Sequence, residues 1–201
     1  MEQICNQITL RGTLRELPTL SHENHGKQFY RFELEVPRLS GAVDVLPVIA
    51  EDRLLMGLDP TAGAWIRVEG QIRSHNIRKE DGRHLQIFVF ASSIAVEDGE
   101  PLNEVTLEGT VCRDPNYRRT PLGREICDMM LAVPRAFRRA DYLPCILWGR
   151  TAQLGADCRT RDRIRISGRL QSRSYRKQTD QGCEERTAYE ISAMSAEVPE
   201  D

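Results

Sequence analysis

The chain repeats itself at a shift of about 97 residues, and this repeat limits the folds that it can form. The segment NQITLRGTLRELP at 6–18 aligns with NEVTLEGTVCRDP at 103–115. At a shift of 98, IRVEGQIRS at 66–74 aligns with IRISGRLQS at 164–172. The 201 residues therefore consist of two copies of one small unit. Between them lies AVEDGEP, whose glycine, proline and acidic residues are typical of a linker.

Each copy has the pattern of a small β protein. In the second copy, residues 163–173 alternate most clearly, with Ile164, Ile166, Gly168 and Leu170 on one face and polar side chains on the other. Similar patterns predict the other strands, and the whole set is 103–111, 126–133, 141–148, 163–173 and 186–194. One short helix is expected over 151–158, between the third and fourth strands.

Five strands with a short helix after the third, in fewer than about 100 residues, favour a small five-stranded Greek-key barrel, the OB-fold. We therefore predict an all-β protein of two tandem OB-folds, each with a short helix between strands three and four. The expected division is a first unit over 1–95, a linker over 96–101, a second unit over 102–196 and a short acidic tail over 197–201.

The charge of the chain differs between its halves. The net charge of −2 argues against nucleic-acid binding by the chain as a whole. Residues 1–100 hold 11 basic and 15 acidic side chains, whereas residues 101–201 hold 17 basic and 15 acidic ones. Sixteen of the 17 basic residues in the second half are arginine. Arginine forks onto phosphate and stacks on planar groups. An anionic partner is therefore expected on the second half.

Several functional classes find no support in the sequence. No apolar run reaches the roughly 18 residues that span a bilayer, and the N-terminus lacks a signal-peptide pattern, so we expect a cytoplasmic protein. The six cysteines form no Cys-x-x-Cys pair, and the four histidines lie in the other half from five of them, so no metal site is expected. Without a phosphate-binding loop or a pair of metal-binding carboxylates, we predict no enzyme activity and no cofactor.

The segment VPRAFRRADYLPCILWGR at 133–150 interleaves aromatic rings with arginines. On a strand, Tyr142 and Trp148 share one face, while Leu143 and Leu147 share the other and can fill a barrel. The two rings are roughly 20 Å apart at ~3.3 Å per residue, which suits two separate stacking platforms. Rings among cations are typical of a groove for single-stranded nucleic acid. This strand alone equally fits a Trp148 that closes the barrel end and a Tyr142 that is an ordinary strand residue.

The second unit resembles the bacterial single-stranded DNA-binding protein family over about 102–196. The resemblance lies in four segments that match in order and spacing: RDPNYRRTPLG (113–123), LAVPRAF (131–137), ADYLPCILWGRTAQ (140–153) and GRLQSRSY (168–175). The first unit is similar to this family mainly through the internal repeat.

The resemblance implies four places where bases stack. These fall on Phe137 at the end of the second strand, Tyr142 and Trp148 at the two ends of the third, and Tyr175 in the loop between the fourth and fifth. The basic positions of the family fall on Arg118, Arg138, Arg150 and Arg173, and the local pattern adds Arg169 and Arg176. Phe137 and Tyr175 lie beside arginines in polar segments, which a core residue would avoid.

The first unit lacks this chemistry. Its corresponding positions are Ser40, Val45, Glu51 and Ile77, and none is aromatic. We therefore predict a structural barrel with a degenerate DNA site. The alternative is a groove built from other rings, such as Phe29, Tyr30 and Trp65.

The predicted function is sequence-independent binding and protection of single-stranded DNA in replication, recombination or repair. The resemblance also implies a homodimer that presents four OB-folds. The chain ends in SAEVPED, without the acidic-hydrophobic tip by which the family recruits other proteins, and this favours a phage, plasmid or specialised paralogue. The alternative function is that of a primosome-like or mobile-element accessory OB protein that acts mainly through protein–protein contacts.

Overall fold

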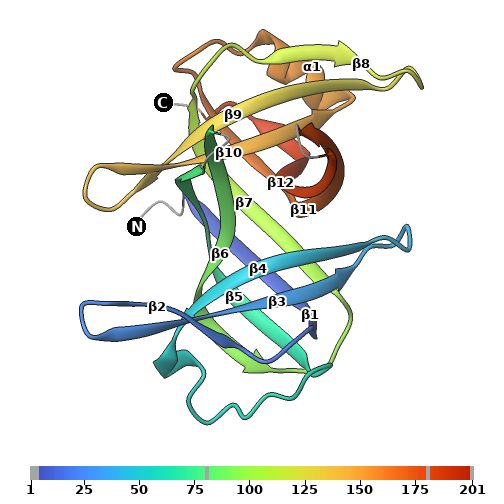
Figure 1. The fold of residues 1–201 in the computed structure, drawn as a ribbon. Coiled ribbons are helices and arrows are strands. Elements are labelled where there is room, and N and C mark those ends of the chain that lie inside the picture. The colour runs from blue at the N-terminus through green and yellow to red at the C-terminus, as the bar shows by residue number, and fades with distance from the viewer. Residues whose placement is uncertain (1–4, 80–81, 180–181, 200–201) are drawn as a thin grey trace.

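The computed structural model describes residues 5–79, 82–179 and 182–199, which form two β-barrels (Figure 1). The first unit contains β1 (Asn6–Leu14), β2 (Thr19–Asn24), β3 (Lys27–Pro37), β4 (Val43–Glu51), the 3-10 turn η1 (Asp52–Leu54), β5 (Trp65–Lys79) and β6 (Gly82–Val96). The second unit contains β7 (Leu102–Val111), β8 (Asn116–Arg119), β9 (Glu125–Arg135), β10 (Arg139–Trp148), α1 (Arg150–Asp157), β11 (Arg163–Thr179) and β12 (Gly182–Glu197).

Strand pairing closes each barrel in the same way. In the first unit β1 pairs with β3 and with β5, and β4 runs parallel to β6. In the second unit β7 pairs with β9 and with β11, and β10 runs parallel to β12. Side chains at alternate positions fill the barrels, and Leu143 and Leu147 are fully buried as their alternation predicted. This topology confirms the prediction of two tandem OB-folds.

The short helix predicted in each barrel is a single 3-10 turn in the first unit and an α-helix in the second. There α1 covers Arg150–Asp157 and packs against the strands β9, β10 and β12. In the first unit the same connection forms only the 3 residues of η1, so the predicted helix is shorter there. Gly57 adopts a φ of 79°, and Pro60 offers no backbone N–H. A left-handed residue followed by proline ends any helix in this segment.

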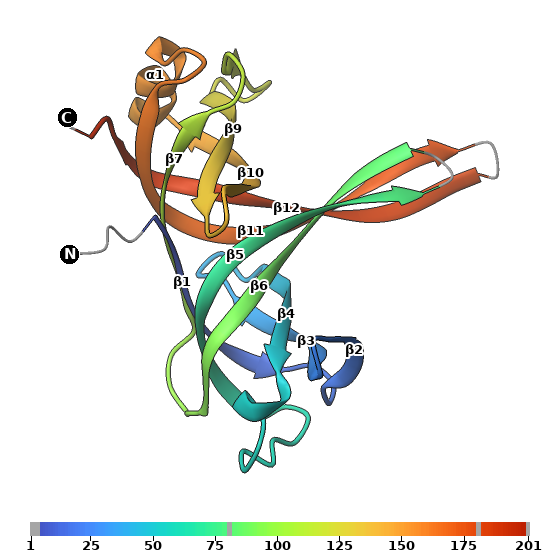
Figure 2. The same ribbon diagram turned by 90° about the vertical axis from the view of Figure 1, so that its left-hand side faces the viewer.

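The last two strands of each unit run well beyond their barrel. β11 continues to Thr179, whereas the apolar alternation ended at Arg173, and β12 begins at Gly182 rather than at 186. Past Leu170 neither face of the hairpin fills a barrel, so period-two alternation no longer marks the strand. We call the projecting parts the first arm (73–79 and 82–88) and the second arm (171–179 and 182–190). Figure 2 shows the two hairpins extending to the same side of the molecule.

A glycine allows each hairpin to bend at its base. The register between β11 and β12 shifts at Ser167/Gly168, and a Cβ on Gly168 would lie 2.1 Å from the carbonyl oxygen of Ser192. At the matching position of the first unit, a Cβ on Gly70 would lie 2.2 Å from the carbonyl oxygen of Phe90. Only a residue without a side chain permits this close approach of two backbones.

The two barrels join through an antiparallel pair of their first strands. Asn6 pairs with Leu107 of β7, and Leu10, which corresponds to Leu107 in the repeat, pairs with Asn103, which corresponds to Asn6. The register is thus symmetric under exchange of the two units, as in an isologous contact between two subunits. One sheet of 12 strands consequently runs through both barrels.

Candidate nucleic-acid interface

The four predicted stacking rings are all exposed. The exposed fractions are 93% for Phe137, 46% for Tyr142, 39% for Trp148 and 38% for Tyr175. An aromatic side chain that served the barrel core would be buried like Leu143 beside it. Packing inside the barrel therefore does not explain these four residues.

Phe137 lies in the turn between β9 and β10. The sequence placed it at the end of the second strand, but β9 ends at Arg135. Phe137 and Arg138 both have positive φ angles, 61° and 55°, as the two central residues of a tight hairpin turn do. Phe137 and Arg138 are thus consecutive residues at the tip of the turn, and both are exposed.

Tyr142 and Trp148 lie on the outer face of β10, near its two ends. The indole N–H of Trp148 donates to the hydroxyl oxygen of Ser192 on β12 at 3.1 Å, and its backbone N–H donates to Thr151 Oγ1 at 2.9 Å. The backbone N–H of Tyr142 donates to Ser74 Oγ of the first unit at 2.7 Å. Both rings are thus carried by backbone that neighbouring elements hold in place.

Tyr175 belongs to a strand, and the expectation that it lies in a loop is wrong. It is part of β11 in the second arm, where it faces Arg186 across the hairpin. The guanidinium carbon of Arg173 lies 5.9 Å from the centre of the Tyr175 ring, within the range of a cation–π contact. The hairpin ladder continues here because backbone pairing does not need a buried face.

The six predicted arginines differ in their ion-pair partners and in the face of the strand on which they lie. Arg118 on β8 pairs with Asp128 at 2.7 and 3.4 Å, and the hydrogen bond to Asp128 raises the pKa of Arg118. Arg138 and Arg150 are exposed and contact no carboxylate in the described part of the chain. The alternation of β11 puts Arg169 and Arg173 on the face of Tyr175 and puts Arg176 on the opposite face.

Two carboxylates of the same surface were missed by the sequence analysis. Asp128 on β9 binds Arg118, and Glu190 on β12 lies 3.6 Å from the Nε of Arg173. Burial raises the pKa of Glu190, the nearby Arg173 lowers it, and the charge of Asp128 raises it. Strand alternation could have predicted that Glu190 lies on the outer face. Its contact with Arg173 could not be predicted, because it depends on how the strands pair. These acids offset part of the positive charge of the arginines.

A second group of arginines surrounds Asp141, which is fully buried. Arg73 of the first unit donates from Nη1 to Asp141 Oδ2 at 3.1 Å, and Arg135 Nη1 lies 3.8 Å from Oδ1. Burial lowers the pKa of Arg135, and the charges of Arg73 and Arg139 lower it further. Arg73 comes from the repeat copy that the sequence analysis set aside, so only the fold reveals this cluster.

The first unit presents different chemistry at the corresponding positions. Glu51, the counterpart of Trp148, pairs with Lys27 at 3.1 Å and with Arg53 at 3.0 Å. Phe29 is only 8% exposed because His22 stacks on it, with ring centres 4.8 Å apart and an interplanar angle of 7°. The other two rings of the alternative groove, Tyr30 and Trp65, are half-buried. A base could not reach the face of Phe29 that His22 covers.

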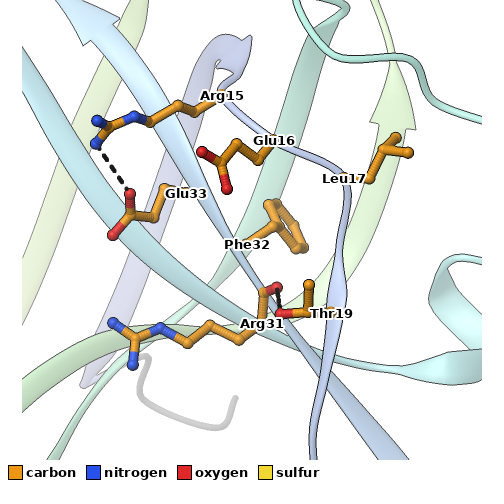
Figure 3. Close-up of a pocket in the computed structure, with 7 residues that line it drawn as sticks. All are labelled: Arg15, Glu16, Leu17, Thr19, Arg31, Phe32 and Glu33. Carbon is orange, nitrogen blue, oxygen red and sulfur yellow. Dashed lines mark hydrogen bonds and ion pairs between the residues drawn. The ribbon is translucent and has the colours of Figure 1, made fainter.

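A pocket of the first unit lies between the segment after β1 and strand β3 (Figure 3). It is bordered by the ion pair of Arg15 and Glu33 at 3.2 Å and by a hydrogen bond from Thr19 Oγ1 to the carbonyl oxygen of Arg31. Phe32 contributes to its lining. The pocket contains none of the predicted site residues.

Among the described residues, no group of three or more His, Cys, Asp or Glu side chains is arranged to hold a metal ion. The helices found in that same part of the chain are too short and too polar to cross a membrane.

Two closed five-stranded barrels define a tandem OB-fold protein. The sequence profile of the Single-strand binding protein family matches residues 102–198. Single-stranded DNA-binding protein B of Bacillus subtilis (strain 168) is 39% identical over 80 residues, which cover 36% of this chain and 71% of that protein. The chain belongs to the single-strand binding protein family.

Further relatives differ in how much of them the chain spans. Single-stranded DNA-binding protein A of Bacillus subtilis (strain 168) is 37% identical over 87 residues, which cover 40% of this chain but only 51% of that protein. The crystal structure of the wild-type single-stranded DNA binding protein from Thermus aquaticus has a TM-score of 0.79 and 25% identity. That likeness covers 98% of this chain and 93% of the Thermus chain, so it includes both barrels.

Proposed function

We propose that the protein binds single-stranded DNA without sequence preference and that the second unit carries the main binding surface. One observation supports this most directly: Phe137, Tyr142, Trp148 and Tyr175 are exposed, while Leu143, Cys145 and Leu147, which alternate with the outer face of β10, are buried. Because these rings do not pack in the core, bases can stack on them. The names of the relatives, which are single-stranded DNA-binding proteins, agree with this function.

Base stacking and phosphate contacts divide the work of binding. Each stacked base contributes about 1–3 kcal/mol, and every base offers a planar face, which makes stacking tolerant of sequence. The arginines of the surface contact the phosphates, with Arg138 beside Phe137 and Arg173 beside Tyr175. Such binding keeps a single strand from pairing, which protects it during replication, recombination or repair. The role requires no catalysis and belongs in the cytoplasm.

The two units divide this function unevenly. The first unit has Ser40, Val45, Glu51 and Ile77 where the second has rings, and we propose that it serves as a structural barrel. The β1–β7 pair already gives each chain two barrels in a symmetric arrangement. We propose further that two chains form a homodimer with four OB-folds.

Quenching of tryptophan fluorescence by oligo-dT tests the proposal. The chain has two tryptophans, so W65F isolates the signal of Trp148 and W148F isolates that of Trp65. We expect saturable quenching in W65F and much weaker quenching in W148F. A protein that acts through protein contacts alone would show no quenching and no change in anisotropy of a labelled oligonucleotide.

A further inference from the structure

The second arm is fastened to the first unit through one buried carboxylate. Asp44, near the start of β4, is only 2% exposed. Its Oδ1 accepts hydrogen bonds from the backbone N–H of Ser172 at 2.7 Å and from the hydroxyl of Ser172 at 3.3 Å. In return the backbone N–H of Val45 donates to Ser172 Oγ at 3.1 Å. Asp44 and Val45 together thus make three hydrogen bonds to Ser172.

Arg38 completes the contact and compensates the buried charge. Its Nε donates to Asp44 Oδ2 at 2.8 Å, and its Nη2 donates to the carbonyl oxygen of Ser172 at 3.1 Å. Hydrogen bonds to charged groups are about twice as strong as those between neutral groups. Both backbone polar groups of Ser172 are thus bound by side chains that lie more than 120 residues away in the sequence.

This contact lies where the second arm leaves its barrel. Leu170 is the last fully buried residue of β11, and Ser172 follows two positions later. Tyr175 is three residues further along, about 10 Å away at ~3.3 Å per residue. Opposite Ser172 on β12 stands Tyr189, whose pKa is raised by burial and by the charge of Glu33 in the first unit. The base of the arm therefore rests on the first unit.

The repeat provides a second contact of the same kind with no aromatic stacking residue behind it. Asp141 Oδ1 accepts from the backbone N–H of Ser74 at 2.8 Å, as Asp44 does from Ser172. In the first arm, however, the position that corresponds to Tyr175 is Ile77, which is half-buried. Of the two matched contacts, the one at Asp44 holds the arm that carries the exposed ring and its arginine.

We propose that Asp44 is a positioning residue for DNA binding, which holds the second arm so that Tyr175 and Arg173 are presented in one orientation. The inference rests on the proposed function of the second unit. A surface that is ordered before binding loses less conformational entropy when the ligand arrives, and its affinity is correspondingly higher. The first unit would then contribute to binding through Asp44 without touching DNA itself.

A double-mutant cycle tests whether Asp44 acts through Tyr175. We expect D44A to weaken binding of labelled oligo-dT by about 3- to 10-fold, as for the loss of one well-placed hydrogen-bonded group. If Asp44 works by placing the Tyr175 ring, D44A should have little further effect in a Y175A background. Fully additive effects, or unchanged affinity in D44A, would overturn the proposal.

A reporter on the arm reads its order in the absence of DNA. In a W65F/W148F background, Y175W puts the single tryptophan on the arm, and D44A should lower the steady-state anisotropy of its emission. D141A is the matched control, because it removes the same contact from the other arm and should leave the reporter unchanged. If D44A does not fold, S172A tests the same contact with the pair of Arg38 and Asp44 kept: it removes the two hydrogen bonds of the Ser172 hydroxyl and leaves the two backbone bonds, so it should lower the anisotropy by a smaller amount. Unchanged anisotropy in both D44A and S172A would overturn the inference. Failure of the wild-type protein to bind oligo-dT would instead overturn the proposed function alone.

Discussion

The indole N–H of Trp148 donates a hydrogen bond to the hydroxyl oxygen of Ser192 at 3.1 Å and so links the end of β10 to β12. The contact holds the ring by its edge, while 39% of the residue stays exposed. A ring held in this way loses little rotational freedom when a base stacks on it. Trp148 is therefore a suitable residue on which to test the binding surface.

Removing two rings should weaken binding strongly. We expect the double variant F137A/W148A to lose on the order of 2–6 kcal/mol of binding free energy, since each stack contributes about 1–3 kcal/mol and distant sites are nearly additive. Fluorescence anisotropy of a labelled oligo-dT measures the loss. L39A, which removes an exposed apolar side chain from the corresponding turn of the first unit, should bind like the wild type. Equal affinity of the double variant and the wild type would remove these rings from the site.

Affinity should fall as salt increases. Four to six phosphate contacts imply a slope of about −3 to −4 in a plot of log K against log salt concentration, at about −0.7 per contact for single strands. R150A should reduce the magnitude of the slope by about 0.7. R53A removes the corresponding arginine of the first unit and should leave the slope unchanged. A flat salt response of the wild type would mean that the arginines do not contact phosphates.

Binding should take up protons through Glu190. Burial already raises the pKa of this carboxyl, and a bound phosphate chain adds negative charge that raises it further. The complex thus holds a proton more tightly than the free protein, so affinity increases as pH falls toward the pKa of Glu190 in the complex. E190Q should bind more tightly at neutral pH and show a shallower pH dependence. E104Q makes the same charge change at an exposed position of β7 and should do neither.

Stability should depend on the glycine at the base of the second hairpin. A Cβ at Gly168 would lie 2.1 Å from the carbonyl oxygen of Ser192, so G168A must push two paired strands apart. We expect a loss of about 1–3 kcal/mol in the free energy of unfolding, as for other overpacked sites. Thermal unfolding measures it, and S167A, next to this position, serves as the control. A Tm of G168A equal to that of the wild type would contradict the close backbone contact.

The oligomeric state can be measured directly. Light scattering at micromolar protein concentration should give about twice the chain mass of 22.9 kDa if two chains assemble into a set of four barrels. A mass equal to that of a single chain would exclude the homodimer under those conditions.

The sequence by itself determined the two barrels and, in the second one, which side chains face the core and which face outward. Burial on one side of a strand leaves a period-two pattern in the sequence, so Leu143 and Leu147 could be assigned to the core and Tyr142 and Trp148 to the outer face. The repeat extended this reading to the first unit. Local signals of this kind depend only on residues close together in the chain.

Only the tertiary structure decided which residues of the two units contact each other. The hydrogen bond from Ser172 to Asp44 joins residues 128 positions apart, and the pair of Glu190 and Arg173 depends on the register of β11 with β12. The length of the arms was also hidden, because beyond Leu170 neither face fills a barrel and the apolar alternation stops. Contacts between distant strands depend on how the strands pair and cross in space, and the pattern of apolar residues along the sequence does not determine this.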